Sequence, residues 1–148
     1  MILILVCFYI GHYYYIHSST KRVFYTQKQL RPIEYIDMVY EKNDAYTFAI
    51  KPYEDDGYMV YAAAMHKSLQ GWRIVRMGGT RLELNGPGAF VLGKEKQISY
   101  GIIDSSVKEM RFKDKKLPYV KYGKMRIWYH ISKPTNQFSK INPSIIYK

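Results

Sequence analysis

The chain has 148 residues, 47% of them hydrophobic and 16% aromatic, which is enough apolar material for one packed domain with a short appendage and excludes a wholly disordered chain. Its single cysteine, Cys7, excludes an internal disulfide and a metal site built from several cysteines. The net charge of +11 predicts attraction to polyanions such as anionic lipid, nucleic acid or acidic wall polymer, without choosing among them.

Residues 1–16 form an uncharged, apolar stretch that ends in aromatic side chains. As a helix it would extend about 24 Å, somewhat short of a hydrocarbon core of about 30 Å, and "YYYI" at its end is typical of a membrane interface. We expect residues 1–20 to form an N-terminal transmembrane helix that anchors the chain through residues 1–16. A linker over 21–30 and a globular domain over 31–148 would follow. A cleaved signal peptide and a buried segment of the domain are the alternatives.

The orientation of this anchor depends on the charges around it. Lys21, Arg22, Lys28 and Arg31 follow the apolar stretch, and no basic residue precedes it. The positive-inside rule alone therefore leaves the domain in the cytoplasm. A start codon assigned too late, which would omit a basic leader, would reverse this orientation.

The remaining pattern predicts an α+β domain, with one short helix packed on a mostly antiparallel sheet of about six strands. Pro32 and the apolar residues at helical spacing after it predict a helix that ends near Asn43 and Asp44. Residues 78–96 hold five of the ten glycines and predict a long connection, either irregular or with a short hairpin of its own. Apolar alternation predicts strands in residues 46–53, 58–66, 71–77, 97–103, 106–112, 117–122 and 124–131.

The last of these strands alternates clearly between two kinds of side chain. One face would carry Met125, Ile127, Tyr129 and Ile131. The other face would carry Lys124, Arg126, Trp128 and His130.

The order of these elements, with "GWRIVRMGG", "SYGII" and "RIWYHI", resembles a group of small single-span exported proteins of Gram-positive bacteria whose function is unknown. The resemblance covers roughly Pro32 to Lys133 and implies an extracytoplasmic, mostly β domain tethered by its N-terminal helix. It supplies no catalytic residues. The loose packing motifs that carry it are Gly71, Trp72, Gly78, Gly79, Tyr100 to Ile103, Val107 and Arg126 to Tyr129.

The chain contains no recognisable catalytic or metal-binding motif. The four histidines lack metal-ligand spacing, the sequence Asp104-Ser105-Ser106 fits a turn, and the glycine-rich stretch has no phosphate-loop pattern. We therefore predict a non-enzymatic protein without a cofactor or metal. An enzyme with dispersed active-site residues around 78–96 is the remaining alternative.

The C-terminal third carries the excess charge: from Val107 onward, eleven Lys or Arg face two acids, a net charge of +9. This favours an accessory or interaction module at the cell envelope, extracytoplasmic and membrane-anchored, that binds anionic lipid or wall polymer. A cytoplasm-facing nucleic-acid-binding domain and a merely solvated strand face are the alternatives. The predicted anionic-ligand surface consists of Lys113, Lys115, Lys116, Lys121, Lys124, Arg126 and Trp128.

Overall fold

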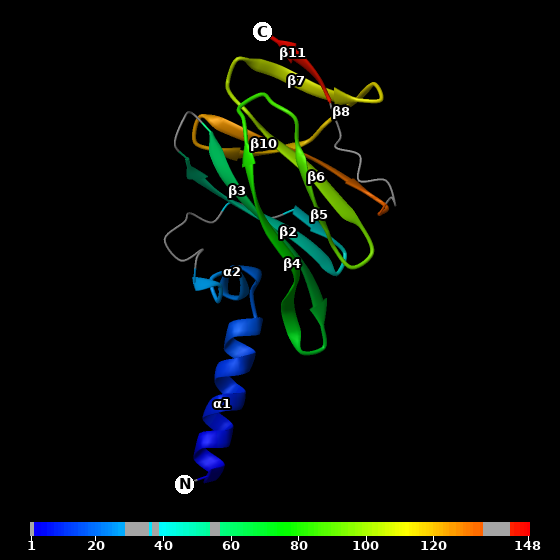
Figure 1. Cartoon of the computed structure of the whole chain (residues 1–148). Helices are drawn as coiled ribbons and strands as arrows, with labels where there is room; N and C mark the ends of the chain where they lie inside the picture. The colour runs from blue at the N-terminus through cyan, green and yellow to red at the C-terminus, as the bar shows by residue number, and fades with distance from the viewer. Residues whose placement is uncertain (1, 29–35, 37–38, 54–56, 135–142) are drawn as a thin grey trace.

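The computed structural model describes residues 2–28, 36, 39–53, 57–134 and 143–148. Figure 1 shows a β-rich body from which helix α1 projects at one end, while the C-terminus lies at the opposite end. The described residues form two helices and eleven strands, which are arranged in three antiparallel sheets.

The two helices lie at the N-terminal end. Helix α1 comprises Ile2–His17 and α2 comprises Thr20–Phe24. Ser19 caps α2, because its hydroxyl accepts a hydrogen bond from the Arg22 backbone N–H at 3.3 Å. Val23 and Phe24 of α2 are buried against the body. The predicted linker over 21–30 therefore begins with residues that belong to the packed domain.

Sheet A contains the first four strands in the order β1-β2-β3-β4. The predicted helix over 32–44 is wrong at its C-terminal end, because Val39–Glu41 is a strand that pairs with β2 across a tight turn. The earlier part of that prediction lies mostly outside the described residues. The bounds are β1 Val39–Glu41, β2 Asp44–Pro52, β3 Tyr58–Ser68 and β4 Gly71–Leu82.

Strand β4 extends into the glycine-rich stretch that we expected to be a connection. Gly79 lies opposite Tyr61 in the β3–β4 ladder, and a Cβ at Gly79 would approach the Tyr61 ring to 2.9 Å. The glycine therefore leaves room for an aromatic side chain across the ladder, and the strand continues through it. A further strand, β5, covers Ala89–Leu92.

The other two sheets are built from the C-terminal half. Sheet B has the order β5-β6-β10-β9, and sheet C has the order β11-β7-β8. Their remaining bounds are β6 Gln97–Ile103, β7 Val107–Phe112, β8 Lys115–Lys116, β9 Tyr119–Tyr122, β10 Met125–Ser132 and β11 Ser144–Tyr147.

Three apolar layers hold these elements together. The central layer joins sheets A and B, where the rings of Phe48 and Tyr100 lie 5.2 Å apart. A second layer lies between sheet A and α2 and contains Phe24 and Trp72. The third lies between sheets B and C and contains Trp128. Sheets A and B each contribute side chains to two of these layers, because successive side chains of a strand point to opposite faces.

The predicted fold class is wrong in two respects. The protein is mostly β, with three sheets in place of one sheet of about six strands under a short helix. The prediction of a transmembrane helix is also wrong, because α1 has only 16 residues. None of the helices in the described part of the chain has both the length and the apolar character needed to cross a bilayer.

Candidate anion-binding site

The structure divides the predicted basic surface into two groups, and the first lies at the β7–β8 hairpin. Lys113, Lys115 and Lys116 are exposed there. The Lys116 ammonium lies 3.6 Å from a carboxylate oxygen of Glu109, and Arg111 donates a hydrogen bond of 2.7 Å to the other oxygen. The Arg111 hydrogen bond and the nearby positive charges hold the pKa of Glu109 below its usual value. An acid therefore already neutralises part of this group.

His130 lies beside the same hairpin. Its ring is 5.3 Å from that of Phe112. Burial, and then the positive charges of Lys113 and Lys115, lower the pKa of His130 below its ordinary value of 6.5. The histidine consequently stays neutral at physiological pH and adds no charge to this group.

The second group lines an open groove of about 380 Å³ at the start of β7 and the β9–β10 turn. Lys121, Lys124 and Arg126 of the prediction lie here, and Lys108 and Lys148 join them. All of the charged side chains that line the groove, within the described part of the chain, are basic. We call this the cationic groove; its full lining is Ser105, Val107, Lys108, Lys121, Gly123, Lys124, Met125, Arg126 and Lys148.

Two local features position the lysines of the cationic groove. Gly123 has a φ of 54° and allows a two-residue turn between Tyr122 and Met125, so Lys124 lies in this turn and Lys121 lies close to it on β9. On the other side, the backbone N–H of Lys148 donates to the Ser106 carbonyl at 3.1 Å. Sequence reasoning missed Lys108 and Lys148. Lys108 reaches the groove because Arg126 of β10 binds the start of β7, and Lys148 reaches it because β11 pairs with β7.

Arg126 is the fixed member of the cationic groove. Its Nη2 donates to the backbone carbonyl of Asp104 at 2.8 Å and also to that of Val107. Its guanidinium carbon lies 5.0 Å from the centroid of the Tyr119 ring. The side chain therefore links β10 to the start of β7 through Nη2, and it contributes positive charge to the groove.

Trp128 does not belong to this surface, which corrects the prediction. It is 0% exposed and lies in the layer between sheets B and C. Its cross-strand partner is Gly101, where a Cβ would come within 2.5 Å of Nε1. A glycine inside the apolar run "SYGII" is a signal of such close approach, and it points to a bulky neighbour on that face.

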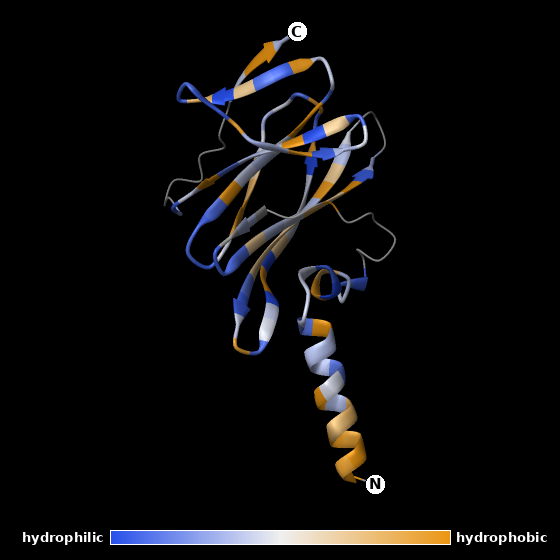
Figure 2. Ribbon diagram, turned by 180° about the vertical axis from the view of Figure 1, so that it is seen from behind, coloured by the Kyte–Doolittle hydropathy of each residue, from blue (hydrophilic) through white to orange (hydrophobic). Residues whose placement is uncertain are grey.

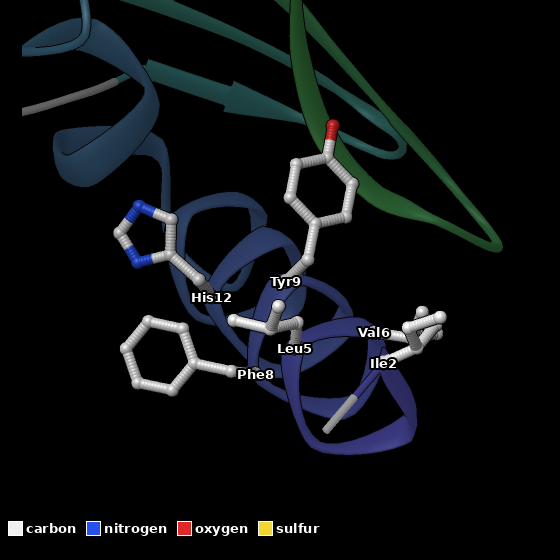
Figure 3. Close-up of a pocket in the computed structure, with 6 residues that line it drawn as sticks. All are labelled: Ile2, Leu5, Val6, Phe8, Tyr9 and His12. Atoms are coloured by element: carbon white, nitrogen blue, oxygen red, sulfur yellow. The ribbon is translucent and has the colours of Figure 1, made fainter.

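The opposite end of the molecule carries exposed apolar surface. Leu3, Ile4 and Phe8 of α1 are between 73% and 76% exposed. Figure 2 shows the most hydrophobic residues gathered in the N-terminal half of this helix. Figure 3 shows the side chains that line an apolar hollow there, and all of them come from α1: Ile2, Leu5, Val6, Phe8, Tyr9 and His12.

A scan against protein-family models and searches of curated proteins and of solved structures find no match. The resemblance to exported proteins of Gram-positive bacteria therefore stays a prediction. Among the residues that the structure describes, no three His, Cys, Asp or Glu side chains are grouped so that they could hold a metal ion.

Proposed function

We propose that the protein is a membrane-anchored, non-enzymatic binding module of the cell envelope. Helix α1 inserts into lipid without crossing the bilayer, and the cationic groove binds an anionic wall polymer. The observation that carries this proposal is the placement of the two surfaces, because the apolar helix and the β7–β11 end of the body lie at opposite ends of the molecule (Figure 1).

Lipid is the favoured environment for α1 because its apolar surface surrounds the helix. Ile2, Leu3, Ile4 and Leu5 are consecutive and each is at least 63% exposed. Four successive residues cover the whole circumference of a helix with 3.6 residues per turn. Burying one such side chain contributes about 1.5–3 kcal/mol, so insertion of this segment contributes on the order of 10 kcal/mol. A partner protein would cover one side, whereas lipid covers all sides.

The C-terminal end of α1 has the features of a membrane interface. Tyr13, Tyr14 and Tyr15 form an aromatic belt there. Arg22 lies 3.8 Å above the Tyr15 ring and donates hydrogen bonds to the Tyr15 carbonyl and the Ser18 hydroxyl. In this arrangement the N-terminal turns enter the hydrocarbon and the guanidinium stays at headgroup level.

The position of the cationic groove favours a polymer over the lipid of the same membrane. With α1 inserted, the groove lies toward the end of the body that is far from the bilayer holding the protein. Trp128 is buried and cannot stack on bases, which weakens the nucleic-acid alternative, because single-strand binders rely on exposed aromatic rings. The resemblance to exported proteins adds support for an extracytoplasmic position.

The binding test uses the full chain in nanodiscs of neutral phosphatidylcholine, with poly(glycerol phosphate) as the probe. We expect the double variant K121E/K124E to bind at least several-fold more weakly than the wild type. The matched control is K51E, which places the same kind of charge change on an exposed lysine of β2 outside the groove. Equal binding by the double variant and the wild type would refute the role of the groove.

The same nanodiscs distinguish the two classes of polymer. The nucleic-acid alternative would replace the wall-polymer proposal if the protein bound single-stranded DNA more tightly than poly(glycerol phosphate). In that case the affinity for DNA should fall steeply between about 50 and 200 mM salt.

The side of the membrane is tested with a C-terminal epitope tag and protease on intact cells, with lysed cells as the control. Loss of the tag from intact cells is the expected result.

A further inference from the structure

The turn between β3 and β4 presents an apolar side chain fully to solvent. Ser68 pairs with Gly71 at the end of the ladder, so Leu69 and Gln70 form the turn. Two-residue hairpin turns favour Gly, Asn and Asp, whereas here Leu69 has a relative exposure of 105%. A single exposed leucine is common on protein surfaces and does not by itself indicate a binding site. Three features of its surroundings indicate one here.

The first relevant feature is that this hairpin is attached to the end of α1. His17 donates a hydrogen bond from Nδ1 to the backbone carbonyl of Trp72 at 2.6 Å, since a carbonyl can only accept. Gly71, with a φ of 97°, lies so close to the His17 carbonyl that a Cβ would come within 2.4 Å of the oxygen. Ile16 also packs in the same apolar layer as Trp72.

The second feature is the direction of the hairpin. Figure 1 and Figure 2 both show that its tip points toward the α1 end of the molecule and lies level with the last turns of the helix. These turns carry the aromatic belt from Tyr13 to Tyr15. The tip would therefore lie at interface depth if α1 is inserted.

The third feature is charge. The segment from Lys67 to Arg76 contains Lys67, Arg73 and Arg76 and no Asp or Glu. All three basic residues are exposed, and the Lys67 ammonium lies 5.9 Å from the Trp72 ring centroid. Basic side chains beside a projecting apolar residue fit an interface with anionic headgroups, where the apolar group enters the lipid and the cations remain in the headgroup layer.

We infer that the β3–β4 turn is a second membrane contact, in which Leu69 enters the lipid interface and Lys67 and Arg73 meet anionic headgroups. This inference rests on the proposed insertion of α1. One helix alone would let the body tilt and rotate about its axis, whereas two attached contacts fix one orientation. The cationic groove is then held at a distance from the bilayer.

The test places one environment-sensitive fluorophore at a time on the full chain, in vesicles of phosphatidylcholine and phosphatidylglycerol that contain a nitroxide-labelled lipid. The native Cys7, which is exposed on α1, reports insertion of the helix. In a Cys7→Ser background, Gln70→Cys reports the turn and keeps Leu69 in place. Lys124→Cys, at the β9–β10 turn, is the matched control at the far end.

We expect quenching at Cys7 and at position 70 to exceed that at position 124 several-fold, and Leu69→Glu to reduce quenching at position 70 several-fold. The inference about the turn would be overturned by either of two results: quenching at position 70 equals that at position 124, or Leu69→Glu leaves quenching at position 70 unchanged. In both cases quenching at Cys7 would still support the insertion of α1. Absence of quenching at Cys7 would overturn both.

Discussion

Replacing Gly71 by alanine should uncouple α1 from the body. Gly71 has a φ of 97°, in the region where a side chain is strained. A Cβ at this position would lie 2.4 Å from the His17 oxygen and 3.0 Å from the His17 carbonyl carbon. Both are backbone atoms, so the contact can be relieved only by moving the hairpin away from the end of the helix.

The expected loss follows from two contributions. An L-residue in a left-handed conformation costs about 1–2 kcal/mol. Separation of the hairpin from α1 removes the 2.6 Å hydrogen bond between His17 and Trp72, and a hydrogen bond of this kind contributes about 1 kcal/mol. We therefore expect Gly71→Ala to lower the free energy of unfolding by about 2–3 kcal/mol.

Urea unfolding of the full chain in nanodiscs measures this loss through the fluorescence of the two tryptophans, Trp72 beside α2 and Trp128 between sheets B and C. Gly78→Ala is the matched control, because a Cβ at Gly78 would meet no atom within 4 Å and the position has no positive φ. It should leave stability unchanged or raise it by about 0.5–1 kcal/mol. Equal stabilities of the two alanine variants would refute the reasoning.

Three further predictions concern sheets B and C. Trp128→Ala should lower the free energy of unfolding by about 3–5 kcal/mol. Trp128→Phe should lower it much less, because Nε1 of Trp128 has no hydrogen-bond partner among the described residues. Urea titration of the two variants measures the difference. Gly101→Ala should destabilise the protein and broaden the bands of its near-ultraviolet circular dichroism spectrum, because the new Cβ would lie 2.5 Å from Trp128 Nε1. An unchanged spectrum would contradict this prediction. The pKa of His130 is lower in the folded protein than in the unfolded chain, so the unfolded chain binds a proton at this histidine more readily. The free energy of unfolding should therefore be highest above pH 6.5 and should fall as the pH drops below that value. A His130→Gln variant should show a flatter profile in that range, and a profile as steep as that of the wild type would exclude His130 as the cause.

Local sequence patterns predicted the strands more successfully than the single helix after residue 30. The strand predicted over residues 97–103 is confirmed, and Ile98, Tyr100 and Ile102, which alternate along it, all lie in the central layer. The pattern around Val39 fits a helix, but its pairing with Tyr46 places it in a strand. Periodicity over a short apolar run does not distinguish the two, and here tertiary pairing decided.

The candidate site was predicted in part. The sequence analysis placed Lys121 and Lys124 on the predicted surface, because these two lysines of the cationic groove lie on one hairpin and are close in sequence. Lys108 and Lys148 were missed, because forty residues separate them from each other and only the β7–β11 ladder brings them together. Trp128 was assigned to the surface because it shares a strand face with Lys124, Arg126 and His130.

The sequence by itself determined which residues share a face of each strand and that the first sixteen residues are apolar and uncharged. Only the tertiary structure decided what covers each face. Sheet C lies over part of the outer face of sheet B and buries Trp128, while Lys124 on the same face stays exposed beyond the covered area. The physical reason is that alternation arises within one strand, whereas burial depends on which distant strands pack against it.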